Sequence, residues 1–231
     1  MRCRAAVIPS FLAAVLLGPA VTAATAADPA ASADGFAIAR LKYDGGGDWY
    51  SNPSSLPNLA RALRDRTTVP VDRDDEVRVS ILDPDFFNYP FVYMNGHGTV
   101  HFSDAEAARL RQYLLAGGFL FADDNYGMDE SFRREVGRVF PDRPLVEVSF
   151  RHPIYHSFYD LPGGPPKVHE HDGKPAQGFG IFDGDRLIVF YTYQSDIGDG
   201  IEDPEVHKDP PEIREQAMQM AINTVVYALG R

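Results

Sequence analysis

Three clusters of glycines and polar residues stand where apolar runs of the sequence end. The first is Asp44-Gly45-Gly46-Gly47-Asp48, followed by Trp49 and Tyr50; the second is Asn95-Gly96-His97-Gly98; the third is Asp123-Asp124-Asn125-Tyr126-Gly127. Glycines let a backbone approach a ligand closely, while carboxylates, amides and an imidazole supply polar chemistry. We therefore expect these clusters to form the functional site.

Proton transfer at such a site would fall to His97, Asp123 and Asp124. An imidazole titrates close to neutral pH, and the glycines on both sides of His97 leave room around it. Two adjacent carboxylates repel each other, which raises the pKa of one of them and suits it to act as an acid or a base. The alternative is that one aspartate only caps the helix that follows.

The glycine-rich first cluster does not match the spacing of nucleotide-binding loops, and its aspartates would repel phosphate. We expect it to admit a neutral or cationic group or to form part of an oxyanion site, a tight strand exit being the alternative. Ser195 lacks the G-x-S-x-G surroundings of a serine nucleophile. The predicted ligand-binding residues are Gly45, Gly46, Gly47, Asp48, Trp49, Asn95, Gly96, Asn125, Tyr126, Tyr193, Ser195 and Asp196.

Four histidines are candidate metal ligands. His152 and His156 stand four residues apart, a spacing that places two side chains on one face of a helix and occurs in zinc sites. His169 and His171 alternate by two, so on an extended segment they also share a side. No recognised pattern such as H-E-x-x-H is present, so ordinary hydrogen-bonded histidines are the alternative and no cofactor is identified.

The clusters can meet only if the elements before them share an edge. Predicted strands at 36–43, 91–94 and 119–122 end directly at the three clusters. A capping box from Ser103 to Glu106 begins a predicted helix between the last two strands, and Gly117 ends it. A short link from helix to strand is typical of a parallel sheet, whose ligand crevice lies outside the carboxyl ends of its strands.

The rest of the chain supplies further elements and one long loop. The predicted elements are a helix from Ser54 or Ser55, a helix over 128–140, a strand at 145–148, a hairpin over 179–193 turning at Asp183-Gly184, and a helix from Glu212. The loop from Leu161 to Gln177 is rich in Pro and Gly. We expect it to fold over the strand ends and bring His169 or His171 near Asp123 or Asp124; a solvated loop on the far side is the alternative.

Residues 1–26 are interpreted as a signal peptide, because Arg2 and Arg4 precede a short apolar stretch and small residues offer a cleavage site. A retained membrane anchor is the alternative. Residues 27–35 are a predicted disordered lead-in, and 36–231 a single α/β domain. We expect an exported protein, periplasmic or secreted, that makes no membrane contact after cleavage.

The exported product would contain no cysteine, because Cys3 is the only one in the chain. Disulfides, thiolate metal sites and cysteine nucleophiles are therefore excluded. The net charge of −11 becomes −13 when Arg2 and Arg4 are removed, with 20 basic residues against 33 acidic ones. Such a charge argues against a nucleic-acid partner.

The stretch from Tyr93 to Asp124 resembles the class I glutamine amidotransferase-like superfamily, including its trehalose-utilisation-like branch. There a glycine-rich oxyanion loop follows one strand and the next strand delivers the nucleophile. More closely, the whole chain resembles a bacterial family known as domain of unknown function 4159, which is placed with this fold and has no established activity. The matching phrases include Gly45-Gly46-Gly47-Asp48-Trp49-Tyr50, His152-Pro153-Ile154-Tyr155-His156, His169-Glu170-His171-Asp172-Gly173 and Ser195-Asp196-Ile197-Gly198-Asp199-Gly200.

Both resemblances imply a three-layer α/β sandwich with a mainly parallel sheet, of flavodoxin-like or amidotransferase-like type. Our first hypothesis for function is a domain that binds a small polar or sugar-like ligand at the strand ends, with Trp49, Tyr50, Tyr126 and Tyr193 as apolar faces. The alternatives are a hydrolase of the cell envelope that uses Asp123 or Asp124 with His97, with or without a metal, and an assembly module that contacts other envelope proteins through a surface away from a vestigial pocket.

The position that matches the amidotransferase nucleophile falls at or near Asp123, where a thiol is missing. Protein lacking residues 1–26 should therefore release no glutamate from glutamine and should be insensitive to iodoacetamide. Glutamate release is measured with a coupled dehydrogenase. Release that Asp123→Ala abolishes would contradict the prediction and identify an unexpected nucleophile.

Overall fold

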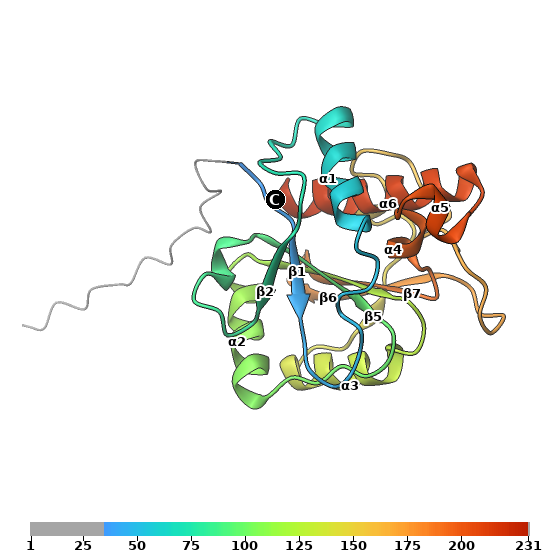
Figure 1. Cartoon of the computed structure of the whole chain (residues 1–231). Coiled ribbons are helices and arrows are strands. Elements are labelled where there is room, and N and C mark those ends of the chain that lie inside the picture. Colours follow the sequence, from blue (N-terminus) through green and yellow to red (C-terminus); the bar gives the residue numbers. More distant parts are fainter. Residues whose placement is uncertain (1–34, 231) are drawn as a thin grey trace, which may run out of the picture.

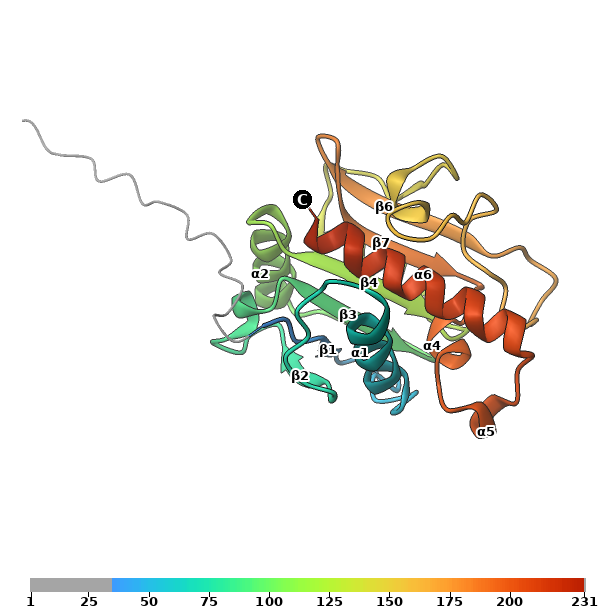
Figure 2. The same cartoon turned by 90° about the horizontal axis from the view of Figure 1, so that it is seen from above.

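A computed structural model of the protein describes residues 35–230. The predicted signal peptide at 1–26 and, apart from Gly35, the predicted lead-in at 27–35 lie outside the described residues. The described residues form an α/β structure in which helices cover both faces of one mixed sheet (Figures 1 and 2). None of the described helices has the length and apolar character needed to cross a lipid bilayer.

The sheet has seven strands in the order β2-β1-β3-β4-β7-β6-β5. The first five strands of this order are parallel, and β6 runs antiparallel to both of its neighbours, which confirms the prediction of a mainly parallel sheet. The strands are β1 (Ala39–Lys42), β2 (Val77–Ser80), β3 (Phe91–Gly96), β4 (Phe119–Asp124), β5 (Val146–Glu147), β6 (Gln177–Asp183) and β7 (Arg186–Tyr193).

Two helices lie on each face of the sheet. α1 and α6 cover one face and α2 and α3 the other, as Figure 1 shows above and below the strands. Two short helices, α4 and α5, lie beside the carboxyl end of β7. The helices are α1 (Ser55–Arg66), α2 (Asp104–Leu115), α3 (Asp129–Val139), α4 (Ile197–Gly200), α5 (Pro204–His207) and α6 (Pro211–Leu229), with 3₁₀ turns η1 (Phe86–Asn88) and η2 (Pro153–Tyr155).

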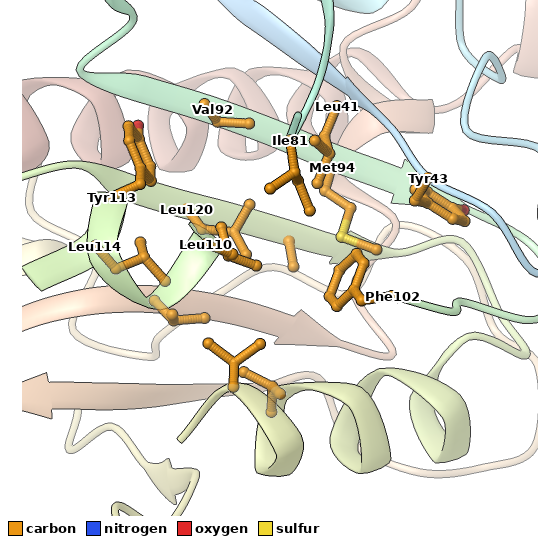
Figure 3. Close-up of a cluster of buried hydrophobic side chains, with 14 of the residues drawn as sticks. Leu41, Tyr43, Ile81, Val92, Met94, Phe102, Leu110, Tyr113, Leu114 and Leu120 are labelled. Atoms are coloured by element: carbon orange, nitrogen blue, oxygen red, sulfur yellow. The ribbon is translucent and has the colours of Figure 1, made fainter. Parts of the chain in front are cut away.

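The central strands are apolar on both faces because both are buried. Along β3, Phe91 and Tyr93 point into the core under α1 and α6, whereas Val92 and Met94 point into the core over α2 and α3. Figure 3 shows the second of these cores, where Val92 and Met94 lie among side chains of α2 and β4. This double burial explains why the sequence of β3 is a continuous apolar run.

Local sequence signals define most elements correctly. The predicted capping box begins α2: the Ser103 side chain accepts a hydrogen bond from the Glu106 amide, and the Glu106 carboxylate accepts one from the Ser103 amide at 2.8 Å. The predicted hairpin forms β6 and β7, which are joined through Gly184 and Asp185. The helices predicted from 128 and from 212 form α3 and α6.

Three local predictions need correction. Ser54 makes no cap hydrogen bond to α1, because its hydroxyl instead donates to Glu202 at 3.0 Å. The strand predicted over 145–148 is shorter than expected: β5 comprises Val146 and Glu147, and the Val148 amide adds one hydrogen bond to the Gly178 carbonyl at 2.8 Å. His152 and His156 do not share a helical face, because the segment between them is the single 3₁₀ turn η2.

A buried arginine fixes the loop between β1 and α1. The Arg40 side chain is fully buried, and its Nε lies 2.6 Å from a Glu76 carboxylate oxygen. Its guanidinium also donates to the Ser51 carbonyl at 2.8 Å and to the Asn95 Oδ1 at 2.5 Å. A buried charge needs such complete pairing, so the loop from Trp49 to Asn52 is held against the end of β3.

We predict that Arg40→Met lowers the free energy of unfolding by about 3–5 kcal/mol, because it leaves the buried loop carbonyls and Asn95 without their donor and removes the buried one of the two arginines that pair with Glu76. The matched control is Arg78→Met: Arg78 contacts the same Glu76 at 2.8 Å but its side chain is 51% exposed. That change should cost less than about 1 kcal/mol. Urea unfolding followed by circular dichroism measures both, and equal losses would contradict the role assigned to Arg40.

Candidate functional site

The three predicted clusters lie together at the carboxyl ends of β1, β3 and β4. Asn95 and Gly96 on β3 stand directly opposite Asp123 and Asp124 on β4. The first cluster reaches the same place because the Asp48 carboxylate contacts the His97 ring nitrogen Nδ1 at 3.1 Å. The structure thus brings the predicted catalytic residues to one edge of the sheet.

Gly96 permits this close approach. Its φ of +145° is a backbone conformation that residues with a side chain rarely adopt. A Cβ there would also stand 2.3 Å from the Tyr43 hydroxyl and 3.0 Å from Asp48 Oδ1. Only glycine therefore allows the β1 loop to lie against the end of β3. Trp49 and Tyr50 take separate positions beyond it: Trp49 lies under Lys42 and Arg78, while Tyr50 is 60% exposed.

Asp123 is fully buried and acts as an anchor for the backbone after β7. Its carboxylate accepts hydrogen bonds from the amides of Ile197 at 3.1 Å and Gly198 at 2.7 Å, and from the Thr192 hydroxyl at 2.5 Å. Burial raises the pKa of Asp123 to about 7, although these three hydrogen bonds act in the opposite direction. The carboxylate is therefore occupied by protein donors.

Asp124 shapes the turn before α3 without capping the helix, whose N-cap is Met128. Its Oδ1 accepts hydrogen bonds from the amides of Tyr126 and Met128, both at 3.0 Å, and so leads the chain into α3. Burial raises the pKa of this carboxyl. Its Oδ2 is buried and accepts no hydrogen bond from the described residues, since the nearby Tyr191 hydroxyl donates to Asp129 at 3.0 Å.

The loop over 161–177 lies on the strand ends, where the Val168 amide donates to the Ser195 carbonyl at 2.9 Å. Its histidines contact different acids from those predicted. His171 Nε2 lies 2.7 Å from Asp196, and His169 Nδ1 lies 3.0 Å from Asp199. Asp123 and Asp124 are occupied by backbone amides, so the acids that follow β7 take their place.

Six residues contact one another in what we call the acid–histidine cluster. They are His169, His171, His207, Asp196, Asp199 and Asp209. Asp199 links this cluster to the rest of the site, because its Oδ1 accepts a hydrogen bond from Asn125 at 2.9 Å and another from Asn52. Tyr126 borders the acid–histidine cluster, because its ring stacks on that of His171 with the ring centroids 4.4 Å apart. The predicted Asn125, Tyr126 and Asp196 therefore share one site.

Neighbouring ionisable groups of the acid–histidine cluster have pKa values that are shifted in opposite directions. Burial, reinforced by Asp123 and Asp199, raises the pKa of Asp196 to about 8. The hydrogen bond to Asp199 raises the pKa of His169 to about 9, whereas burial and the adjacent His169 lower the pKa of His171. For Asp199, hydrogen bonds from His169 and Asn52 outweigh burial and lower the pKa. Such separation is typical of sites that bind or transfer protons.

Backbone strain concentrates on the same loops. Five non-glycine residues among those described adopt a left-handed backbone, and four of them line the site: Asn52, Tyr126, Gln194 and Asp196, with φ between 56° and 85°. Such conformations cost about 1–3 kcal/mol each and persist where the surroundings enforce them. The strain is therefore a second, independent mark of a functional region.

Several predicted residues lie apart from this cluster. His152 packs against Phe182 and Tyr227 near the start of β7, at the amino ends of the parallel strands. His156 contacts Asp160 at 2.5 Å. The predicted set of four metal-binding histidines is thus divided between two regions. Tyr193 accepts from Lys174 at 3.0 Å, and the Ser195 hydroxyl is bound to the Pro166 carbonyl.

Sequence reasoning missed Asn52, His207 and Asp209 as site residues, and it did not single out Asp199. Asp199 could have been predicted as a site residue, because it belongs to the motif Ser195-Asp196-Ile197-Gly198-Asp199-Gly200. His207 and Asp209 stand in the connection between α4 and α6 at no recognisable spacing. Only the fold brings that connection next to the 161–177 loop.

The family model for Domain of unknown function (DUF4159) matches residues 37–229. The chain belongs to this family. The match extends from just before β1 to the last residue of α6, so it includes all three clusters and the acid–histidine cluster. A search of curated proteins found no match.

The raised carboxyl pKa values give this member of the family an unusual pH dependence. Asp123 and Asp196 have pKa values of about 7 and 8 in the native state and ordinary values near 3.8 when unfolded. Between these values the native state binds more protons, so the free energy of unfolding falls as pH rises, by up to about 1.4 kcal/mol per pH unit for each group. The raised pKa of His169 acts with the same sign above its ordinary value of 6.5.

We therefore predict that stability decreases from pH 5 to pH 8, measured by urea unfolding in the presence of EDTA. Asp196→Asn should reduce this slope, because it removes one of the groups that titrate in that window. Asp160→Asn is the control, since Asp160 also pairs with a histidine but lies outside the site. Stability that is constant or rises over this range would refute the electrostatic description.

Proposed function

We propose that the protein binds a small, sugar-like ligand rich in hydrogen-bond donors at the carboxyl ends of β3, β4 and β7. The observation that supports this most directly is a set of buried oxygens without donors among the described residues: Asp124 Oδ2, Asn125 Oδ1, Asp196 Oδ1 and Asp209 Oδ2. An unsatisfied buried polar atom costs about 1–3 kcal/mol. All four are acceptors, so a ligand that satisfied them would have to offer hydroxyl or ammonium groups.

The strand order supports a ligand crevice at the carboxyl end of β3, which borders the proposed site. The parallel strands follow the order 2-1-3-4-7, which corresponds to the 2-1-3-4-5 order of flavodoxin-like folds. α1 follows β1 on one face and α2 follows β3 on the other, so the strand order reverses between β1 and β3. Ligands of such folds bind at this point. On this ground we propose that the fold belongs to the flavodoxin-like and class I amidotransferase-like group.

The size of the ligand is limited by the loops. Asn125 and Asp196 are essentially inaccessible to solvent, and the 161–177 loop lies over them. A more open groove, of about 570 Å³, lies elsewhere, between α2 and α3. A ligand at the strand ends must therefore be small or must displace the 161–177 loop. We also retain the proposal that the protein acts outside the cytoplasm, on the strength of the signal-peptide interpretation of residues 1–26.

A hydrolase is a second candidate, and one observation favours it. Asp196, whose pKa is raised by burial and by neighbouring acids, contacts His171, whose pKa is lowered by burial. This pair could transfer a proton at neutral pH. The assignment moves the acid–base role from Asp123 and Asp124, whose carboxylates bind backbone amides, to Asp196 and His171.

The binding proposal is tested by thermal shift with a panel of monosaccharides, polyols and amino sugars, followed by calorimetry on any hit. Asp196→Asn should weaken binding by about tenfold, because the amide replaces one of the two carboxyl oxygens and a buried group left without its hydrogen-bond partner costs about 1–3 kcal/mol. Asp160→Asn should bind as the wild type does. Binding that is equal in both variants, or a panel without a single hit, would refute the proposal.

A further inference from the structure

His169, Asp199 and His207 come from separate segments and converge. One ligand atom from each lies within 4.8 Å of the others, although 38 positions separate the first residue from the last. His169 Nδ1 stands 3.0 Å from one Asp199 oxygen and His207 Nε2 stands 3.8 Å from the other. The shorter of these distances is close to the spacing of about 3.3 Å between two ligand atoms that are placed 2.0–2.1 Å from a tetrahedral zinc.

A second carboxylate orients the His169 ring for such a role. Asp209 Oδ1 lies 3.0 Å from His169 Nε2, so it holds the nitrogen that points away from Asp199. The Asp209 side chain is only 9% exposed, and its Oδ2 accepts no hydrogen bond from the described residues. A carboxylate behind a histidine is the usual support of a metal-binding imidazole, because it fixes the ring and raises its basicity.

A buried acid also lies on the other side of His169. Asp196 is fully buried, and its Oδ2 stands 3.9 Å from the same Nδ1 that faces Asp199. Its Oδ1 accepts no hydrogen bond from the described residues. Glu202, at 3.1 Å from His207 Nε2, adds a further carboxylate. Four carboxyl groups, those of Asp196, Asp199, Asp209 and Glu202, therefore stand around His169 and His207, and the oxygens among them that lack donors suit a cation.

We propose that His169, His207 and Asp199 bind a divalent transition metal ion, with Asp209 as the outer support of His169. Two imidazoles and one carboxylate favour zinc and its neighbours over calcium or magnesium, which prefer all-oxygen sites. Three protein ligands leave a fourth position for water or a ligand group. The alternative is a metal-free ion-pair network of the same residues.

The histidines assigned here differ from those expected from spacing. His207 replaces His152 and His156, while His171 stays beside the site through Asp196. The inference is tested separately from the proposed sugar-like ligand, since its experiment measures affinity for the metal alone. A protein that binds metal but no ligand of the panel would retain this proposal and lose the other.

The experiment is a titration of chelator-treated protein with Zn²⁺ by calorimetry, with Co²⁺ absorption as a second readout of tetrahedral coordination. Wild-type protein should bind one equivalent. His207→Ala should abolish that site, and Asp209→Asn should weaken it by about 10–100-fold, as expected for loss of an outer support. His207 is suited to replacement because it lies on the short α5 and is partly exposed.

Two control variants separate a built site from adventitious binding. His156→Ala removes a histidine that also pairs with an aspartate, and His101→Ala removes an exposed histidine that stands 3.8 Å from Glu135. Both should bind Zn²⁺ as the wild type does. Binding that is substoichiometric in the wild type, or that His101→Ala or His156→Ala reduces as much as His207→Ala, would overturn the proposal. Circular dichroism and melting confirm that each variant is folded.

Discussion

The site depends on one buried carboxylate. Asp123 is the last but one residue of the central strand β4 and binds the amides of Ile197 and Gly198, two residues that follow β7 in the chain. These hydrogen bonds fix the turn into α4, and that turn places Asp196 on one side and Asp199 on the other. The acid–histidine cluster is therefore assembled on Asp123, even though Asp123 does not contact its histidines.

This arrangement is costly to fold. Burial disfavours the ionised forms of Asp123 and Asp196, and the loops adopt left-handed backbone at Asn52, Tyr126 and Asp196. Complete pairing elsewhere offsets the cost, most clearly at Arg40, which holds the β1 loop through buried hydrogen bonds. Strain and unpaired acceptors that occur together in one region are better explained by a ligand or a cation than by stability.

The sequence predicted what is encoded locally. The capping box at Ser103, the turn between β6 and β7, and the edge shared by Asn95 and Asp123 follow from short-range patterns and from the rule for parallel strands. The partners of His169 could not be predicted in this way. Asp199 and Asp209 follow β7 in the sequence, and only the fold of the whole domain brings them next to His169. The i, i+4 spacing of His152 and His156 was misleading, since Pro153 begins a single 3₁₀ turn.

Asp199 connects the two functions that we propose. One of its oxygens faces Asn52 and Asn125, which line the strand ends, and the other faces His169. A cation bound by His169, Asp199 and His207 would draw the Asp199 carboxylate toward it and so alter the hydrogen bonds of Asn125, whose Oδ1 is one of the unsatisfied acceptors. Because linkage is reciprocal, a ligand on Asn125 would change the affinity for the cation by the same factor. A single carboxylate shared in this way would make the proposed metal centre and the proposed ligand-binding residues at the strand ends parts of one site.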